Sequence, residues 1–213
     1  MTGSVAPLST VAPHVKEVIL ARHGESELSA VGRTNGDPLV ACGLTPEGRG
    51  QARRLGELLA ADELDLCVVS EFQRVRETAE LALEGRGVPV LVLPELNDVR
   101  VGEFEGRALA DYRAWAHSHG PEEPAPGGGD SRAETIRRYA SAYREILARP
   151  EPNVLVVTHG LPIRYVLDAA SGHAPAPAVE PVPYAESFRL TAEELAAAVE
   201  RLEAWSRQPS WSS

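Results

Sequence analysis

The sequence predicts an α/β protein, a three-layer α/β/α sandwich around a mainly parallel central sheet. Short apolar runs alternate along the chain with segments of helical periodicity, as they do in successive βαβ units. With 213 residues, 43% of them hydrophobic and 24% charged, the chain is long enough to bury the core of one such domain. Because the apolar runs are continuous, we expect helices to cover both faces of the sheet.

Five segments have the length and composition of strands. The first four are short apolar runs, and the fifth alternates apolar and polar residues like a half-exposed strand. They are EVILA (17–21), DLCVVS (65–70), PVLVLP (89–94), NVLVVT (153–158) and YAESFRLT (184–191).

The first long helix is predicted to begin near Thr45. There the sequence Thr-Pro-Glu supplies an N-cap, a first-turn proline and a first-turn acidic residue. We expect its apolar stripe to consist of Ala52, Leu55, Leu58 and Leu59.

Four more helices are predicted from their caps and periodicity. FQRVRETAELALEG follows the second strand, with Ser70 as a candidate cap and Gly85 at its end. A later helix begins at the capping box of Ser131 and Glu134. The segment GLPIRYVLDAA continues from the fourth strand as a helix, and Thr191 caps the last one.

Residues 16–207 are predicted to form a single domain, preceded by a flexible N-terminal tail at residues 1–15. Residues 107–132 include PEEPAPGGG and have the weakest periodicity. We expect them to form a flap or insertion over the site, and a separate linker is the alternative. The proline-rich segment 172–183 is expected to be an irregular loop.

The formal net charge of −10 argues against general binding to nucleic acids or anionic membranes, which requires a basic face. Two cysteines, Cys42 and Cys67, make neither a disulfide framework nor a metal site. No segment has the apolar length of a membrane span, and the opening residues do not read as a signal peptide. We expect a cytoplasmic protein, and the sequence leaves open whether it forms a homodimer.

Positively charged side chains follow three of the predicted strands. Arg22 and His23 follow the first strand and precede Gly24, Arg74 lies within one helical turn of the second, and His159 follows the fourth. Ligands of open parallel sheets bind at the carboxyl ends of the strands. Two arginines and two histidines at one edge therefore indicate a site for a phosphoryl group, and we expect Gly24 to let the backbone approach the bound oxyanion.

The segments VILARHGES, SEFQRVRETA and VVTHG resemble those of the histidine phosphatase superfamily, which has the phosphoglycerate mutase-like fold. GLTPEGRGQARRL, GEFEG, GGGDS and THGLPIR are similar to further segments of that family and occur in the family's order. The resemblance covers roughly residues 17–170 and implies the phosphoglycerate mutase-like α/β fold.

The resemblance implies that His23 is the nucleophile, which attacks phosphorus in line and forms a phosphohistidine. It implies further that Arg22, Arg74 and His159 bind the phosphoryl oxygens at the catalytic centre. Asn35 lies where the family often places a polar phosphate contact.

Arg33 is a further candidate for such a phosphate contact. Ser29 is a departure, because members of the family often carry asparagine there.

The proton donor to the leaving group is expected in LPELNDVRVGEFEG. Counting back from GEFEG places Asp98 where many members of the family carry glutamate. Glu95 and Glu103 are the rival candidates.

The function implied is that of a metal-independent phosphomonoesterase of the histidine acid phosphatase type, without a cofactor. Its partners would be a small phosphorylated substrate and inorganic phosphate, and the class of substrate is open. The alternatives are a phosphoglycerate mutase-type phosphoryl transfer and a phosphate-binding regulatory module without catalysis. The short, acidic middle region favours hydrolysis over transfer, because mutases of the family carry a longer and more basic insertion there.

Overall fold

The computed structural model describes residues 14–211 and contains a five-stranded sheet in the order β3-β2-β4-β1-β5. Strands β1 to β4 are parallel, and β5 pairs antiparallel with β1 at one edge. The strands are β1 (Glu17–Arg22), β2 (Leu66–Val69), β3 (Val90–Val92), β4 (Asn153–Thr158) and β5 (Ser187–Thr191). The mainly parallel sheet that the sequence predicts is confirmed.

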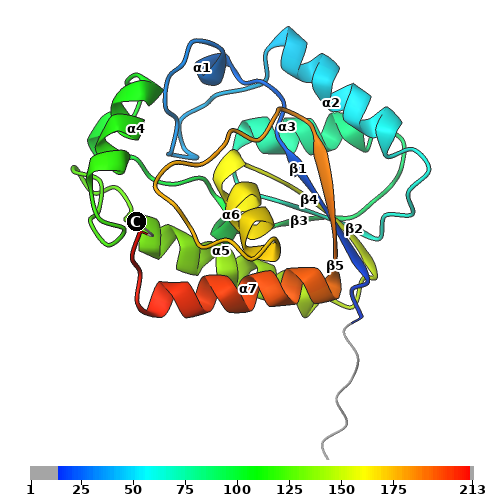
Figure 1. Cartoon of the computed structure of the whole chain (residues 1–213). Coiled ribbons are helices and arrows are strands. Elements are labelled where there is room, and N and C mark those ends of the chain that lie inside the picture. The colour runs from blue at the N-terminus through cyan, green and yellow to red at the C-terminus, as the bar shows by residue number, and fades with distance from the viewer. Residues whose placement is uncertain (1–13, 212–213) are drawn as a thin grey trace, which may run out of the picture.

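Helices cover both faces of this sheet and complete the three layers (Figure 1). Helices α2 and α3 pack on one face, and α5, α6 and α7 pack on the other. The helices are α1 (Glu27–Ala30), α2 (Pro46–Leu58), α3 (Gln73–Ala82), α4 (Leu109–Ser118), α5 (Arg132–Leu147), α6 (Gly160–Ala170) and α7 (Ala192–Arg207), with 3₁₀ turns η1 (Pro94–Leu96) and η2 (Gly102–Phe104).

The two hydrophobic cores show why the central strands are continuous apolar runs. Side chains alternate between the faces of a strand, so Val18 and Leu20 of β1 join the core beneath α5, α6 and α7. Ile19 and Ala21 of the same strand join the core beneath α2 and α3. All four side chains are buried, so β1 is fixed from both sides and holds its carboxyl end rigidly.

Three of the predicted helix caps, Thr45, Ser131 and Thr191, are present. The Thr45 hydroxyl accepts a hydrogen bond from the Gly48 backbone N–H at 3.0 Å, and Ser131 forms its capping box with Glu134. The expectation for Leu58 is wrong, because this side chain is 71% exposed. At 100° per residue, Leu58 lies on the order of 90° away from the centre of the buried stripe.

Gly24 has a packing role, while the role expected for it beside a bound oxyanion stays a prediction. A Cβ on Gly24 would lie 2.4 Å from the Gly48 carbonyl oxygen, so the glycine allows the chain after β1 to pack against α2. Val15, which the sequence places in a flexible tail, is 1% exposed and belongs to the core. His14 of the expected tail is exposed, and residues 1–13 lie outside the described residues.

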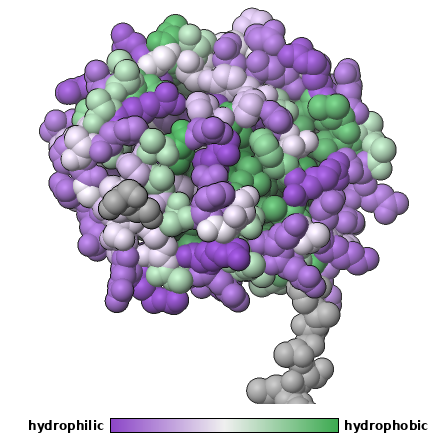
Figure 2. All heavy atoms as spheres, viewed as in Figure 1, coloured by the Kyte–Doolittle hydropathy of each residue, from purple (hydrophilic) through white to green (hydrophobic). Residues whose placement is uncertain are grey.

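Residues 107–132 contain helix α4, which lies apart from the two helical layers (Figure 1). Tyr112 and Ala116 of α4 pack with Val99, Val101 and Ala125 in a small separate core. Figure 2 shows hydrophilic residues over much of the same view, with apolar side chains exposed between them. Within residues 14–211, no helix combines the length and apolarity that crossing a bilayer requires.

Candidate active site

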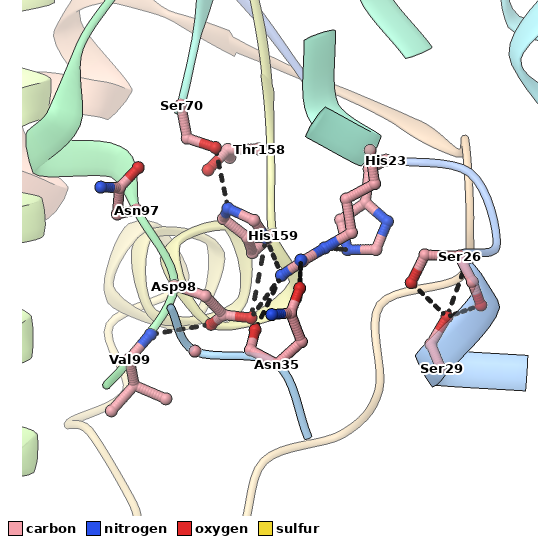
Figure 3. Close-up of polar contacts among 12 residues, drawn as sticks. His23, Ser26, Ser29, Asn35, Ser70, Asn97, Asp98, Val99, Thr158 and His159 are labelled. Carbon is pink, nitrogen blue, oxygen red and sulfur yellow. Dashed lines mark hydrogen bonds and ion pairs between the residues drawn. The ribbon is translucent and has the colours of Figure 1, made fainter. Parts of the chain in front are cut away.

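A pocket of about 370 Å³ lies at the carboxyl ends of β1 and β2 and is lined by most of the predicted site residues. These are Arg22, His23, Arg33, Asn35, Arg74 and Asp98. His159 is 0% exposed and lies directly behind the pocket wall, in contact with Arg74 and Asp98. The structure therefore brings residues from distant parts of the chain to one place, as Figure 3 shows for His23, Asn35, Asp98 and His159.

His23 has the tautomer that a nucleophile requires. Its Nδ1 lies 2.7 Å from the Gly24 carbonyl oxygen, which can only accept, so Nδ1 carries the proton. The Nε2 atom keeps the lone pair and accepts a hydrogen bond from Arg74 Nε at 3.1 Å. Burial, with the nearby charges of Arg74 and Arg22, lowers the pKa of His23 well below its ordinary value. The imidazole is therefore neutral and nucleophilic at neutral pH.

Arg74 connects the other groups of the site. Its Nη2 donates to the Asn35 carbonyl oxygen and approaches His159 Nδ1, each at 3.2 Å, while its Nη1 donates to the Asn35 side-chain oxygen. Asp98 Oδ2 lies 3.6 Å from the same Nη2. Burial lowers the pKa of Arg74, and the Asp98 carboxylate opposes this effect. Arg74 thus presents a fixed positive charge beside the His23 nucleophile.

Arg22 is held from two sides and keeps a free donor. Its Nη1 donates to the Val182 carbonyl oxygen, and its guanidinium carbon lies 4.0 Å from the centroid of the Tyr184 ring. Its Nε is buried without a hydrogen-bond partner. A buried donor without a partner is costly, and a phosphoryl oxygen in the pocket is suited to remove that cost.

His159 is neutral. Burial lowers its pKa well below the ordinary value, and the neighbouring charge of Arg74 adds to the effect. Its Nδ1 accepts from Arg74, so the proton is on Nε2, which donates to the Ser70 hydroxyl at 2.9 Å. The expectation that Ser70 caps α3 is wrong, because Phe72 is the N-cap residue and the Ser70 hydroxyl is bound to His159.

Of the three candidate proton donors, Asp98 is the one that lines the pocket, where Glu180 is the other acidic side chain. Its Oδ1 accepts from the Val99 backbone N–H at 3.0 Å, and its side chain is 26% exposed. Arg138 donates to the Asp98 carbonyl oxygen at 3.1 Å and fixes the backbone there. The rivals Glu95 and Glu103 do not line the pocket.

The two further phosphate candidates differ in their surroundings. Asn35 is bound to Arg74, so it orients that guanidinium. Arg33 is exposed, lines the pocket and donates to the Gly106 carbonyl oxygen at 2.9 Å. Ser29 also lines the pocket, but its hydroxyl is bound to Ser26 at the start of α1.

Glu105 supports the site and is not among the residues that the sequence singles out. Its carboxylate accepts from the Gly36 backbone N–H at 2.8 Å and from the Asn35 side chain at 3.3 Å. Glu105 thereby fixes the loop that orients Arg74. The segment GEFEG contains this residue, and its place in a family-like motif is the signal that would have indicated it.

The two buried histidines predict a loss of stability in acid. Unfolded histidines titrate near pH 6.5, whereas the pKa values of folded His23 and His159 are lower, so the unfolded chain binds more protons below about pH 6.5. The free energy of unfolding should therefore fall as the pH falls below that value, by at most about 1.4 kcal/mol per pH unit for each histidine. Denaturant unfolding in phosphate-free buffer between pH 5 and 7 measures this slope.

His23→Gln and His159→Gln should each make that slope shallower. His173→Ala, at an exposed position on the loop after α6, controls for the loss of a histidine from the surface. Slopes in both variants equal to that of the wild type would show that neither histidine is held neutral.

Among residues 14–211, no group of three or more His, Cys, Asp or Glu side chains is arranged to hold a metal ion. The pocket instead offers arginine N–H groups and a neutral imidazole. Groups of these kinds are able to bind an oxyanion and to attack its central atom, which is the chemistry of phosphoryl transfer.

The fold and the pocket together define an α/β protein with an arginine-lined pocket that contains a buried, neutral histidine. Residues 18–205 match the model of the histidine phosphatase superfamily (branch 1), and the chain belongs to that family. The predicted family is therefore confirmed.

Known relatives include both phosphatases and a mutase. The adenosylcobalamin/alpha-ribazole phosphatase of Salmonella typhimurium is 35% identical over 66% of this chain and 72% of its own. The 2,3-bisphosphoglycerate-dependent phosphoglycerate mutase 2 of Gloeobacter violaceus is 32% identical over 70% and 73%. The alpha-ribazole phosphatase structure from Shigella flexneri superposes with a TM-score of 0.69, at 26% identity, over 81% of this chain and 89% of that one.

Proposed function

We propose that the protein is a metal-independent phosphomonoesterase of the histidine acid phosphatase type, which hydrolyses a small phosphorylated substrate through a phosphohistidine on His23. The observation that carries the proposal is the state of His23. Its neutral imidazole presents the Nε2 lone pair to a pocket in which Arg74 and Arg22 supply positive charge. Asp98 in the same pocket is the acid and base that hydrolysis needs.

In the first step His23 Nε2 attacks phosphorus, and the bond from phosphorus to the leaving oxygen breaks. Asp98, a carboxylate beside Arg74 in the structure, takes up one proton together with the substrate and gives it to that oxygen, so the alcohol leaves neutral. The hydrogen bond that Arg74 Nε donates shifts from His23 Nε2 to a phosphoryl oxygen. The unpartnered Nε–H of Arg22 donates to another phosphoryl oxygen. The product of this step is a phosphohistidine beside an Asp98 carboxylate.

In the second step water attacks the phosphohistidine. The Asp98 carboxylate takes a proton from that water, the bond between phosphorus and Nε2 breaks, and inorganic phosphate leaves. His23 then has its starting tautomer again, because its Nδ1–H is bound to the Gly24 carbonyl oxygen throughout.

Transfer to water rather than to a second substrate hydroxyl is favoured by the middle region. Residues 107–132 hold the ten-residue helix α4, which contributes Tyr112 and His117 to the pocket lining, and an acidic, proline-rich segment outside that lining. A mutase must retain its sugar acid while the phosphoryl group moves, and this short segment offers little chain for such an enclosure.

The proposal predicts phosphate release without any metal. Incubation with p-nitrophenyl phosphate and a panel of phosphorylated metabolites in excess EDTA should release inorganic phosphate at rates equal to those without EDTA. Release should not depend on an added acceptor alcohol. No release from any member of the panel, or loss of activity in EDTA, would overturn the proposal.

A further inference from the structure

Arg132, the first residue of α5, is a buried cation that the proposed reaction does not use. Its side chain is 6% exposed, and it lines the same pocket as His23. Its Nη1 donates to the Tyr165 hydroxyl at 2.6 Å, and its guanidinium carbon lies 5.7 Å from the centroid of the Tyr112 ring. Within residues 14–211, no carboxylate forms an ion pair with it.

Two donors at this point are buried and lack hydrogen-bond partners. They are the Arg132 Nε–H and the hydroxyl of Tyr112, which also lines the pocket. Burial raises the pKa values of Tyr112 and Tyr165, so their hydroxyls are neutral at physiological pH and do not balance the arginine charge. A buried guanidinium without a counter-ion destabilises a fold. Such a group is expected at a site where a bound ligand supplies the counter-ion.

Arg22 has the same feature at the other part of the pocket. Its Nε is also buried without a partner, and this arginine is placed where a phosphoryl oxygen binds. Among the arginines of the described residues, Arg22 and Arg132 are the two with a buried Nε that lacks a hydrogen-bond partner. Both line the pocket that contains His23.

The charge of the pocket exceeds what a phosphoryl group requires. Five arginines and two acidic side chains line it, in a chain whose formal net charge is −10. A phosphate monoester supplies about two negative charges near neutral pH. The remaining positive charge corresponds to one more anionic group on the ligand.

We propose that Arg132, together with the Tyr112 hydroxyl, binds a second oxyanion on the leaving group of the substrate, for which the charge favours a carboxylate. The substrate class is then a phosphomonoester of an alcohol that itself carries an acid group. The inference deepens the proposed function and rests on it, since it assumes that the phosphoryl group enters at His23.

Binding to the His23→Ala protein, which lacks the nucleophile, tests the subsite without turnover. Calorimetry compares glycerol 1-phosphate with 3-phosphoglycerate and with glycerol 1,3-bisphosphate, and glucitol 6-phosphate with 6-phosphogluconate. A ligand with the second oxyanion should bind about 10- to 100-fold more tightly than its neutral counterpart, as expected for charge-assisted hydrogen bonds. The kind of second group, carboxylate or phosphate, that lowers the dissociation constant more identifies the oxyanion that the subsite prefers.

Adding Arg132→Met should bring the ratio of the two dissociation constants close to one. Arg137→Met, which removes an exposed arginine from the same helix, is the control and should preserve the ratio. Because the buried charge has no counter-ion, Arg132→Met should unfold at the same temperature as its parent or higher. Tyr112→Phe removes only a hydroxyl, so it keeps the test valid if the methionine variant fails to fold, and it should reduce the ratio about threefold.

A preference for the second oxyanion that persists in both variants, or the absence of any preference with Arg132 present, would overturn this inference. Such a result with normal hydrolysis of p-nitrophenyl phosphate by the wild type would leave the proposed function intact. Conversely, failure of hydrolysis with an Arg132-dependent preference would overturn the function and support the subsite.

Discussion

His23→Ala is expected to lower kcat/KM for phosphate release by at least about 10⁴-fold, because the variant has no atom to accept the phosphoryl group. The substitution removes the ring that contacts Arg74 and the Gly24 carbonyl, while strand β1, which ends directly before residue 23, is held by cores on both faces. Steady-state assays on p-nitrophenyl phosphate measure the loss, and circular dichroism verifies that the variant folds.

The control for this substitution is His173→Ala, which removes a histidine from an exposed loop position. It should retain the activity of the wild type. Residual activity of His23→Ala above about one hundredth of the wild-type value would show that another group is the nucleophile.

Asp98→Asn is expected to slow the hydrolysis of alkyl phosphates by about 10²- to 10⁴-fold, because the alkoxide loses its proton donor. The effect on p-nitrophenyl phosphate should be much smaller, since nitrophenolate leaves without protonation. Asparagine keeps an oxygen for the Val99 N–H, so the loop around residue 98 should hold its position. Single-turnover rates for both kinds of ester give the ratio.

Glu95→Gln is the matched control, three positions earlier in the same segment and outside the pocket lining. Its rates for the two kinds of ester should change by the same small factor. If Glu95→Gln rather than Asp98→Asn shows dependence on the leaving group, the assignment of the donor to Asp98 is incorrect.

The strand ends were predictable because two strong local signals coincide there. Continuous apolar runs mark strands that are buried on both faces, and the charged residues that follow them must then lie at the sheet edge. Arg22, His23 and Arg74 line one pocket for this reason. Because β2, β4 and β1 are adjacent and parallel in the sheet, residues that follow them lie close together although they are far apart in the sequence.

The errors arose where a local rule competes with a tertiary contact. A serine before a helix usually caps it, but the Ser70 hydroxyl is bound to His159, which follows β4 far along the chain. Leu58 satisfies the i, i+3 spacing with Leu55, yet the sheet contacts a narrower face of α2 and leaves it exposed.

The supporting residues could not be derived from the sequence without the fold. Arg132 follows a capping serine at a helix start, where an arginine is ordinarily solvated. Its burial depends on Tyr112 of α4 and Tyr165 of α6, whose approach to α5 is a tertiary property. For Glu105 the GEFEG motif indicates the residue, but its contact with a loop about seventy residues earlier is likewise a tertiary property.

The central claim is that His23 carries the phosphoryl group during turnover, and rapid quenching tests it most directly. Wild-type protein is mixed with a ³²P-labelled substrate from the phosphate-release panel, quenched in alkali within one turnover, and digested for mass spectrometry. We predict an acid-labile, base-stable phosphate on His23 that forms before inorganic phosphate appears. Release of labelled phosphate with no label on His23 at any quench time would contradict the mechanism.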